Sequence, residues 1–182
     1  MTPTDDAAIA RFRELLQIPT VSRTDESEID WQPFDDFLAA LVRLYPHTHE
    51  TLEREVVDGH SLLYRWPGAQ ASDPLVLMAH LDVVPVVDEE WDHPPFAAEI
   101  VGEGADAAIH ARGAIDDKGA LVAILEAVEQ LVAEGFAPAH DVYLSFGHNE
   151  ETAGEGAQAI VALLTERGVR PGLVIDEGGA VV

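Results

Sequence analysis

The chain has 182 residues, of which 47% are hydrophobic, enough for one domain with a buried core. Its net charge of −24 disfavours binding to nucleic acid or anionic membranes, and the absence of cysteine excludes disulfides and thiolate metal sites. The first residues lack the basic and apolar regions of a signal peptide, and no apolar run approaches the roughly 20 residues of a membrane span. We therefore predict a cytoplasmic protein.

Apolar residues spaced by three and four positions predict amphipathic helices, and short apolar runs between turn residues predict strands. In chain order these patterns predict a helix from Thr4 to about Ile18, a loop over 23–30, a helix over 31–45, strands over 52–57 and 61–66 joined at Asp58-Gly59, and a strand over 75–79. They then predict a loop over 86–96, short strands over 97–101 and 107–111, a helix that follows 116–119 and runs to about 134, a strand over 142–146, a helix over 155–167 and a strand over 173–175.

The run Leu75 to Ala79 has no polar alternation, which is typical of a strand covered on both faces. From this strand onward, strands and helices alternate along the chain. The alternation predicts an α/β fold, with a mainly parallel twisted sheet and helices on both of its faces. In such sheets the functional crevice lies outside the carboxyl ends of the strands.

Metal-capable side chains follow three of the apolar strands and precede one helix. Carboxylates side by side in a partly buried site repel one another, and they need protons, bases or a cation as compensation. Since few basic residues are nearby, a divalent metal is the simplest compensation, and one histidine with several carboxylates suits zinc, cobalt or manganese. The groups are His80 with Asp82, Asp116 with Asp117, Glu150 with Glu151, and Asp176 with Glu177.

Each group also has an ordinary structural interpretation. A single histidine at a strand end is more often structural or solvent-facing, and Asp116 and Asp117 are suited to capping a helix. Glu150 and Glu151 are compatible with a solvated charge pair in a very acidic protein. The recurrence of such groups after three strands that share one sheet edge favours a site.

Five segments stand in the order and spacing of a known enzyme group: residues 80–85, 91–96, 112–119, 149–151 and 176–178. Through them the chain resembles, from Leu15 onward, the dinuclear zinc metallopeptidase family of acetylornithine deacetylase, succinyl-diaminopimelate desuccinylase, glutamate carboxypeptidase and aminoacylase. Within the family it is most similar to the Gly-Xaa carboxypeptidase and N-acyl-amino-acid hydrolase branch. The resemblance implies a zinc-peptidase-like catalytic domain.

The resemblance also implies two divalent metal ions, with zinc first and cobalt or manganese as alternatives. Asp116 would bridge the two ions, and Glu151 would be a ligand of the first. His80 and Glu177 would join Asp116 at the second. Family members often have a cis peptide after the bridging aspartate, which places it between Asp116 and Asp117.

The remaining residues of the motifs acquire roles in the same way. Asp82 would hold the other nitrogen of the His80 imidazole. Glu150 would be the general base, which takes a proton from a metal-bridging water and passes it to the leaving amine. Asp117 and Lys118 would support the bridge.

The activity implied is hydrolysis of an amide bond next to a free carboxylate, in a peptide or an N-acyl amino acid. Deacetylation or desuccinylation in amino-acid biosynthesis and a non-catalytic metal-binding module remain alternatives. The family supplies a last metal-binding histidine from a later segment and inserts a small domain that usually sets the oligomeric state, here a homodimer. We therefore expect residues 1–182 to be the N-terminal part of a catalytic domain, with little activity alone. Asn149 departs from the family pattern, which often has an acid there.

Overall fold

The computed structural model describes residues 3–86 and 91–177, with side chains from residue 6 onward. The predicted loop over 86–96 is therefore described in part, and residues 178–182 lie outside the described residues. The helices are α1 (Pro3–Leu16), α2 (Gln32–Leu44), α3 (Pro46–Thr51), α4 (Lys118–Ala133) and α5 (Glu155–Glu166), with short 3-10 helices η1 (Glu26–Glu28) and η3 (Gly104–Asp106). The strands are β1 (Glu53–Val57), β2 (Ser61–Trp66), β3 (Gln70–His80), β4 (Glu99–Val101), β5 (Ala108–His110), β6 (His140–Gly147) and β7 (Leu173–Ile175).

These elements confirm the helices and strands predicted from the sequence, with shifts of a few residues at their ends. Among the described residues, the α-helix α3 and the two short 3-10 helices are additional. Pro46 ends α2 as predicted, but it also occupies the first turn of α3, where its missing N–H costs no hydrogen bond. None of the helices in the described part of the chain is long and apolar enough to cross a membrane.

The main sheet has the strand order β1-β2-β6-β3-β7, and β4 and β5 form a separate hairpin. Strands β6, β3 and β7 are parallel, whereas β1, β2 and β6 pair antiparallel. The α/β class is confirmed, with a mixed sheet whose parallel part is made by the strands that precede the predicted site residues. The hairpin turn is also confirmed: Asp58 and Gly59 have φ of 50° and 83°, conformations that suit such turn residues.

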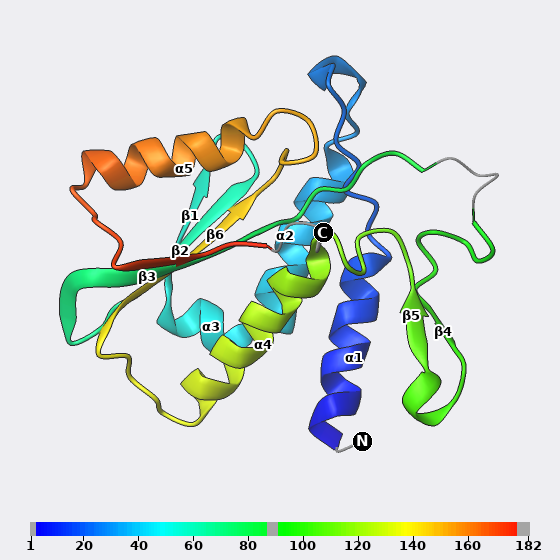
Figure 1. Ribbon diagram of the computed structural model, residues 1–182, viewed down its shortest axis with the longest axis horizontal. Coiled ribbons are helices and arrows are strands. Elements are labelled where there is room, and N and C mark those ends of the chain that lie inside the picture. Colours follow the sequence, from blue (N-terminus) through cyan, green and yellow to red (C-terminus); the bar gives the residue numbers. More distant parts are fainter. Residues whose placement is uncertain (1–2, 87–90, 178–182) are drawn as a thin grey trace, which may run out of the picture.

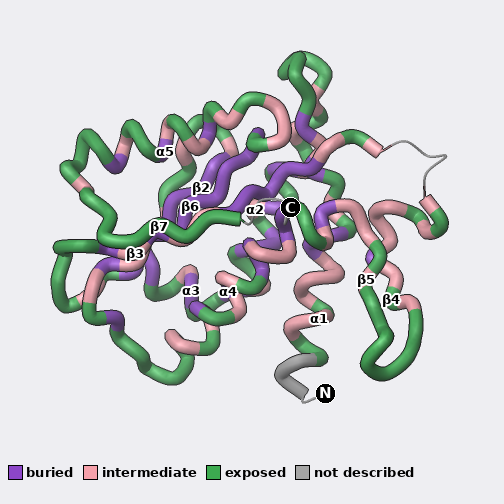
Figure 2. Tube along the Cα trace, viewed as in Figure 1, coloured by how far each residue is buried: buried purple, intermediate pink, exposed green. Residues whose placement is uncertain are grey.

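Helices cover both faces of the main sheet, as predicted (Figure 1). Helices α1 to α4 lie on one face, and α5 lies on the other. Strand β2 shows how the sequence serves both layers: Leu62 and Tyr64 belong to the core under α1 to α4, whereas Leu63 packs with Ile160 of α5. Figure 2 shows the resulting arrangement, with buried strands at the centre and largely exposed outer helix faces.

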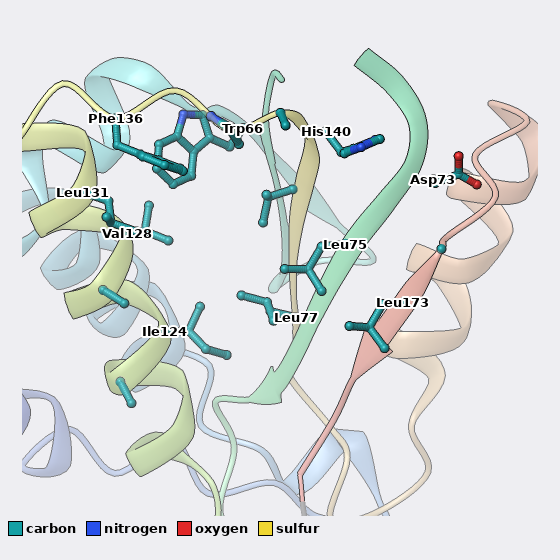
Figure 3. Close-up of a pocket in the computed structure, with 16 residues that line it drawn as sticks. Trp66, Asp73, Leu75, Leu77, Ile124, Val128, Leu131, Phe136, His140 and Leu173 are labelled. Atoms are coloured by element: carbon teal, nitrogen blue, oxygen red, sulfur yellow. The ribbon is translucent and has the colours of Figure 1, made fainter. Parts of the chain in front are cut away.

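An apolar groove of about 870 Å³ lies between α4 and strands β3 and β7 (Figure 3). Leu77 and Ile124 face each other across it, and Phe136 and Leu173 line its ends. Strand β7 forms the edge of the sheet, and the side chains of its three residues are half exposed. The described residues therefore leave apolar surface open on this side of the sheet.

Candidate metal centre

The three parallel strands bring the predicted groups to one edge of the sheet. His80 is the last residue of β3, and it pairs in register with Gly147, the last residue of β6. Glu150 and Glu151 follow β6, and Glu177 follows β7. The carboxyl ends of the strands therefore hold histidine and carboxylates together, as expected for a parallel arrangement.

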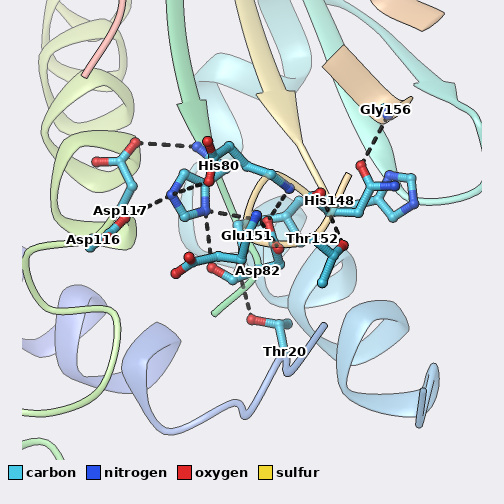
Figure 4. Close-up of polar contacts among 12 residues, drawn as sticks. Thr20, His80, Asp82, Asp116, Asp117, His148, Glu151, Thr152 and Gly156 are labelled. Carbon is cyan, nitrogen blue, oxygen red and sulfur yellow. Dashed lines mark hydrogen bonds and ion pairs between the residues drawn. The ribbon is translucent and has the colours of Figure 1, made fainter. Parts of the chain in front are cut away.

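His80 is the centre of this group, with only 2% of its surface exposed (Figure 4). Its Nε2 lies 2.9 Å from Asp116 Oδ1 and 3.8 Å from one carboxylate oxygen each of Glu150 and Glu177. Its Nδ1 lies 3.1 Å from the backbone oxygen of Asp82 and 3.3 Å from Oδ1 of the same residue. One ring nitrogen thus faces the predicted ligands, and the other faces the predicted orienting aspartate.

Asp82 has a second set of contacts that the sequence did not indicate. Its side chain is fully buried and accepts hydrogen bonds from the backbone N–H groups of Glu150 (3.0 Å) and Glu151 (3.2 Å). A carboxylate that accepts backbone N–H groups makes strong, charge-assisted hydrogen bonds. Asp82 therefore joins the end of β3 to the turn that follows β6, in addition to facing the imidazole of His80.

The aspartates before α4 hold the other side of His80. The peptide bond between Asp116 and Asp117 is cis, as the family resemblance implied. The exposed Asp116 carboxylate reaches the imidazole, while the buried Asp117 carboxylate accepts the backbone N–H of His80 at 3.2 Å. Asp116 therefore holds the imidazole ring of His80, and Asp117 holds its backbone.

Lys118, the only lysine of the chain, lies beneath this group and is fully buried. Its ammonium donates hydrogen bonds to the carbonyl oxygens of Leu15 (3.2 Å) and Ile18 (2.6 Å) at the end of α1, and it lies 4.7 Å from the centre of the Phe37 ring. Burial lowers the pKa of Lys118 to about 7, although the charge of Asp82 opposes the shift. Lys118 thus anchors α1 to the segment that bears the aspartates.

A short parallel pairing holds the chain just after His80. The N–H of Val83 donates to the Thr20 carbonyl (2.9 Å), and the N–H of Ser22 donates to the Val83 carbonyl (3.1 Å). The Thr20 hydroxyl, which is buried, donates to the Leu81 carbonyl at 2.6 Å (Figure 4). Residues 20–22 are therefore part of the frame of the site, which the sequence pattern did not predict.

The pKa values show that this group of side chains favours positive charge at its centre. For His80, burial is the largest single effect and lowers the pKa, but Asp82, Asp116 and Asp117 together outweigh it and raise the pKa to about 10. Burial, followed by neighbouring carboxylates, raises the pKa of Glu151. The crowding of carboxylates around one imidazole is relieved by a cation, whether a proton or a metal ion.

Two overlapping sets of side chains among the described residues have the composition and spacing of metal ligands. His80, Asp116 and Glu151 offer atoms that all lie within 4.8 Å of one another, and so do His80, Glu150 and Glu177. The three other predicted ligands, Asp116, Glu151 and Glu177, are therefore all close to His80. Glu150, the predicted base, stands in the second set with Glu177. The distribution of the ligands between two ions stays a prediction.

The site opens into a pocket of about 210 Å³. The pocket is lined by His80, Glu150, Asp176 and Glu177, and by small residues at the ends of β3 and β6. The larger apolar groove of Figure 3 contains none of the predicted ligands. The candidate site therefore lies at the smaller pocket, at the polar edge of the sheet.

Two further residues after β6 support the site, and neither was assigned a role from the sequence. The buried His148 lies with Nδ1 2.7 Å from the hydroxyl of Ser61 on β2. The Asn149 side chain contacts the start of α5. One signal was present in the sequence: Gly154 occupies the N-cap of α5, so the capping oxygen must come from elsewhere.

Comparison with known proteins supports this description. Residues 76–182 match the pattern of the peptidase family M20/M25/M40. N-fatty-acyl-amino acid synthase/hydrolase PM20D1 of Homo sapiens is 38% identical over 170 residues, which is 92% of this chain and 33% of the relative. Probable carboxypeptidase S-like 1 of Dictyostelium discoideum is 37% identical over 171 residues, or 92% of this chain and 34% of the relative. The chain thus spans about a third of the length of these curated relatives.

Solved structures show the same fold. The M20 family metallo-carboxypeptidase Sso-CP2 of Sulfolobus solfataricus has a TM-score of 0.66 and 26% sequence identity, over 100% of this chain and 38% of the other. The di-peptidase Dug1p of Saccharomyces cerevisiae has a TM-score of 0.73 at 20% identity, over 96% and 39% of the two chains, a likeness of fold alone. The structural comparison and the sequence comparison therefore both lead to M20 peptidases.

Proposed function

The chain belongs to the peptidase family M20/M25/M40, and we propose that its protein is a metal-dependent hydrolase that cleaves an amide bond next to a free carboxylate. The proposed substrates are dipeptides, peptides with a free C-terminus, or N-acyl amino acids. The observation that carries the proposal is the pair of overlapping ligand sets that share His80. The names of the curated relatives, a carboxypeptidase-like protein and an acyl-amino acid hydrolase, support this substrate class.

We propose that the site holds two divalent ions, with zinc first and cobalt or manganese as alternatives. The donor set fits such ions, because one imidazole nitrogen and several carboxylate oxygens surround a point where the pKa shifts favour positive charge. Asp116 would bridge the ions and Glu151 would bind the first. His80 and Glu177 would bind the second with Asp116. Bound ions would polarise the scissile carbonyl and make a coordinated water more acidic.

The residues of the chain would then carry the proton transfers. Glu150 is suited to be the base because its side chain is half exposed towards the pocket while its backbone is held by Asp82. It would accept a proton from the attacking water and return it to the nitrogen of the leaving amine, so that no proton is gained or lost. Asp82 would keep the metal-facing nitrogen of His80 free by holding the other one.

The test is Glu150→Gln in the full-length protein, loaded with zinc and assayed on a panel of dipeptides and N-acyl amino acids. Because the base is lost and the other site residues remain, kcat should fall by about 10³-fold or more while two ions per chain are retained in metal analysis. A chelator should abolish wild-type turnover, and zinc should restore it. Glu166→Gln, an exposed glutamate at the end of α5, is the matched control. Undiminished turnover in Glu150→Gln would exclude the proposed base.

We also propose that residues 1–182 are the N-terminal part of the catalytic domain, with further ligands and a dimer-forming domain elsewhere in the full-length protein. The share of the relatives that the chain spans supports this, and so does the apolar surface left open beside β7. The 182-residue chain should then bind zinc more weakly than the full-length protein. Equal affinity in isothermal titration would contradict the proposal. The cytoplasmic location stays a prediction from composition.

A further inference from the structure

We propose that Asn149 is a positioning residue for Glu150 and Glu151. Its side-chain amide joins the turn that carries the two glutamates to the first turn of α5, and an amide is required there because Glu155 stands opposite. We call this contact the Asn149 clamp. It rests on the proposed function only in that the two glutamates are taken as base and metal ligand.

The clamp acts on a turn that is closed by Asn149 itself. The backbone carbonyl of Asn149 accepts hydrogen bonds from the N–H groups of residues 152–154, at 3.4, 3.1 and 2.8 Å. Both glutamates lie inside this closed turn. Because the turn pivots on Asn149, a shift of that residue changes the place of both carboxylates.

The first arm of the clamp is the side-chain oxygen of Asn149, which is 5% exposed. It accepts the backbone N–H of Gly156, in the first turn of α5, at 3.0 Å (Figure 4). The N-cap residue of α5 is Gly154, at φ 68°, which has no side chain to accept a hydrogen bond. Asn149 therefore supplies the helix cap from outside the helix, a contact typically worth about 1 kcal/mol.

The second arm is the side-chain nitrogen, which donates a hydrogen bond to Glu155 Oε2 at 2.9 Å. An aspartate at position 149 would keep an acceptor for the helix N–H, but it would place a second carboxylate against Glu155 with no donor between them. This explains in physical terms why the chain has asparagine where the family pattern often has an acid.

The element to which the clamp is attached has little freedom to move. A Cβ added at Gly156 would lie 2.1 Å from the Ser61 hydroxyl and 2.8 Å from His148 Nδ1, so the start of α5 is in close contact with the buried pair beneath it. On its other side, the turn is held by Asp82 through two backbone N–H groups. The turn that follows β6 is thus held on one side by Asp82, which follows β3, and on the other side by the Asn149 clamp to α5.

Asn149→Ala, Asn149→Asp, Glu155→Gln and the exchange Asn149→Asp with Glu155→Gln, made in the zinc-loaded full-length protein, test the clamp. Asn149→Ala should lower kcat by about tenfold or more, with KM changed by less than about threefold, because positioning of the reacting groups is lost rather than substrate binding. Asn149→Asp should lower kcat less. The exchange should restore kcat to within about twofold of wild type, since carboxylate and amide swap places and keep their hydrogen bond.

The exchange pair separates positioning from general stability. If kcat of the exchange variant stays as low as that of Asn149→Asp, or if Asn149→Ala lowers the melting temperature with kcat unchanged, the proposal is overturned. Glu166→Gln on the same helix is the control for charge removal.

Two measurements without turnover keep the clamp testable if the proposed function is wrong. Hydrogen–deuterium exchange of the peptide 152–160 should be faster in Asn149→Ala, and the affinity for Co²⁺, followed by its visible absorption, should be lower. A wild-type protein that hydrolyses none of the substrates would refute the proposed function alone. Unchanged exchange and unchanged Co²⁺ affinity in Asn149→Ala would refute the clamp.

Discussion

Asp82→Asn should weaken metal binding and folding together, because the one carboxylate serves both. It is fully buried, it faces His80 Nδ1 at 3.3 Å, and it accepts the N–H groups of Glu150 and Glu151 at 3.0 and 3.2 Å. The substitution keeps the shape of the side chain but replaces one acceptor oxygen by an NH₂ donor. One of the buried donors that surround residue 82 must then face another donor.

The size of the effect follows from these contacts. A hydrogen bond to a charged acceptor contributes about 1.5–3 kcal/mol, and an N–H left unpaired in the interior costs about 1–3 kcal/mol. These two energies describe the same lost hydrogen bond and are not added, so we expect the free energy of unfolding to fall by about 2–3 kcal/mol. Loss of the partner that orients a metal-binding histidine typically weakens metal affinity by about 10–100-fold, which we expect here for zinc.

Urea unfolding measures the first effect, and zinc competition with a chromophoric chelator measures the second. Asp141→Asn is the matched control, because Asp141 is also buried and accepts hydrogen bonds from Arg65 Nε (2.9 Å) and the N–H of Gly68 (2.8 Å), but lies at the start of β6. Asp141→Asn should lower stability by a similar amount and leave zinc affinity unchanged. If Asp82→Asn also leaves zinc affinity unchanged, Asp82 does not orient His80.

Two further outcomes are expected. Gly156→Ala should lower the free energy of unfolding by about 1–3 kcal/mol in a urea titration, because its Cβ would overlap the Ser61 hydroxyl. Gly147→Ala is the control: its Cβ would meet nothing closer than 4.0 Å, so it should lower the free energy of unfolding by less than about 1 kcal/mol. Burial lowers the pKa of His49 below its ordinary 6.5, so the unfolded chain binds the proton more readily than the folded chain. The free energy of unfolding should therefore fall as the pH drops from 6.5 towards the pKa of folded His49, by at most about 1.4 kcal/mol per pH unit. His49→Gln should reduce that slope, and an unchanged slope would exclude His49 as its source.

The positions of helices and strands were predictable because their signals are local. The apolar run at Leu75 to Ala79 identifies a strand covered on both faces, and the spacing of apolar residues in α4 identifies its buried side. The prediction that the chain turns at Asp58-Gly59 rests on the same kind of signal. Each depends on neighbours within a few positions, which a sequence displays directly.

The grouping of the site residues was predictable for a different reason. Parallel strands end at one edge, so His80, Glu150 and Glu177 were expected together although up to 97 positions separate them, counted from 80 to 177. The prediction needed only strand direction. It did not need the register that sets His80 beside Gly147, which depends on the packing of both sheet faces.

The sequence by itself determined the α/β class, and it carries the candidate residues His80, Asp116, Glu150, Glu151 and Glu177 within the segment 76–182 that matches this peptidase family. Only the tertiary structure showed how these side chains are held in place. It made Asp82 the tie between two strands, placed the single lysine against the end of α1, and made an asparagine side chain the cap of α5. These contacts join residues 7 to 103 positions apart, and no local pattern specifies which buried donor meets which acceptor.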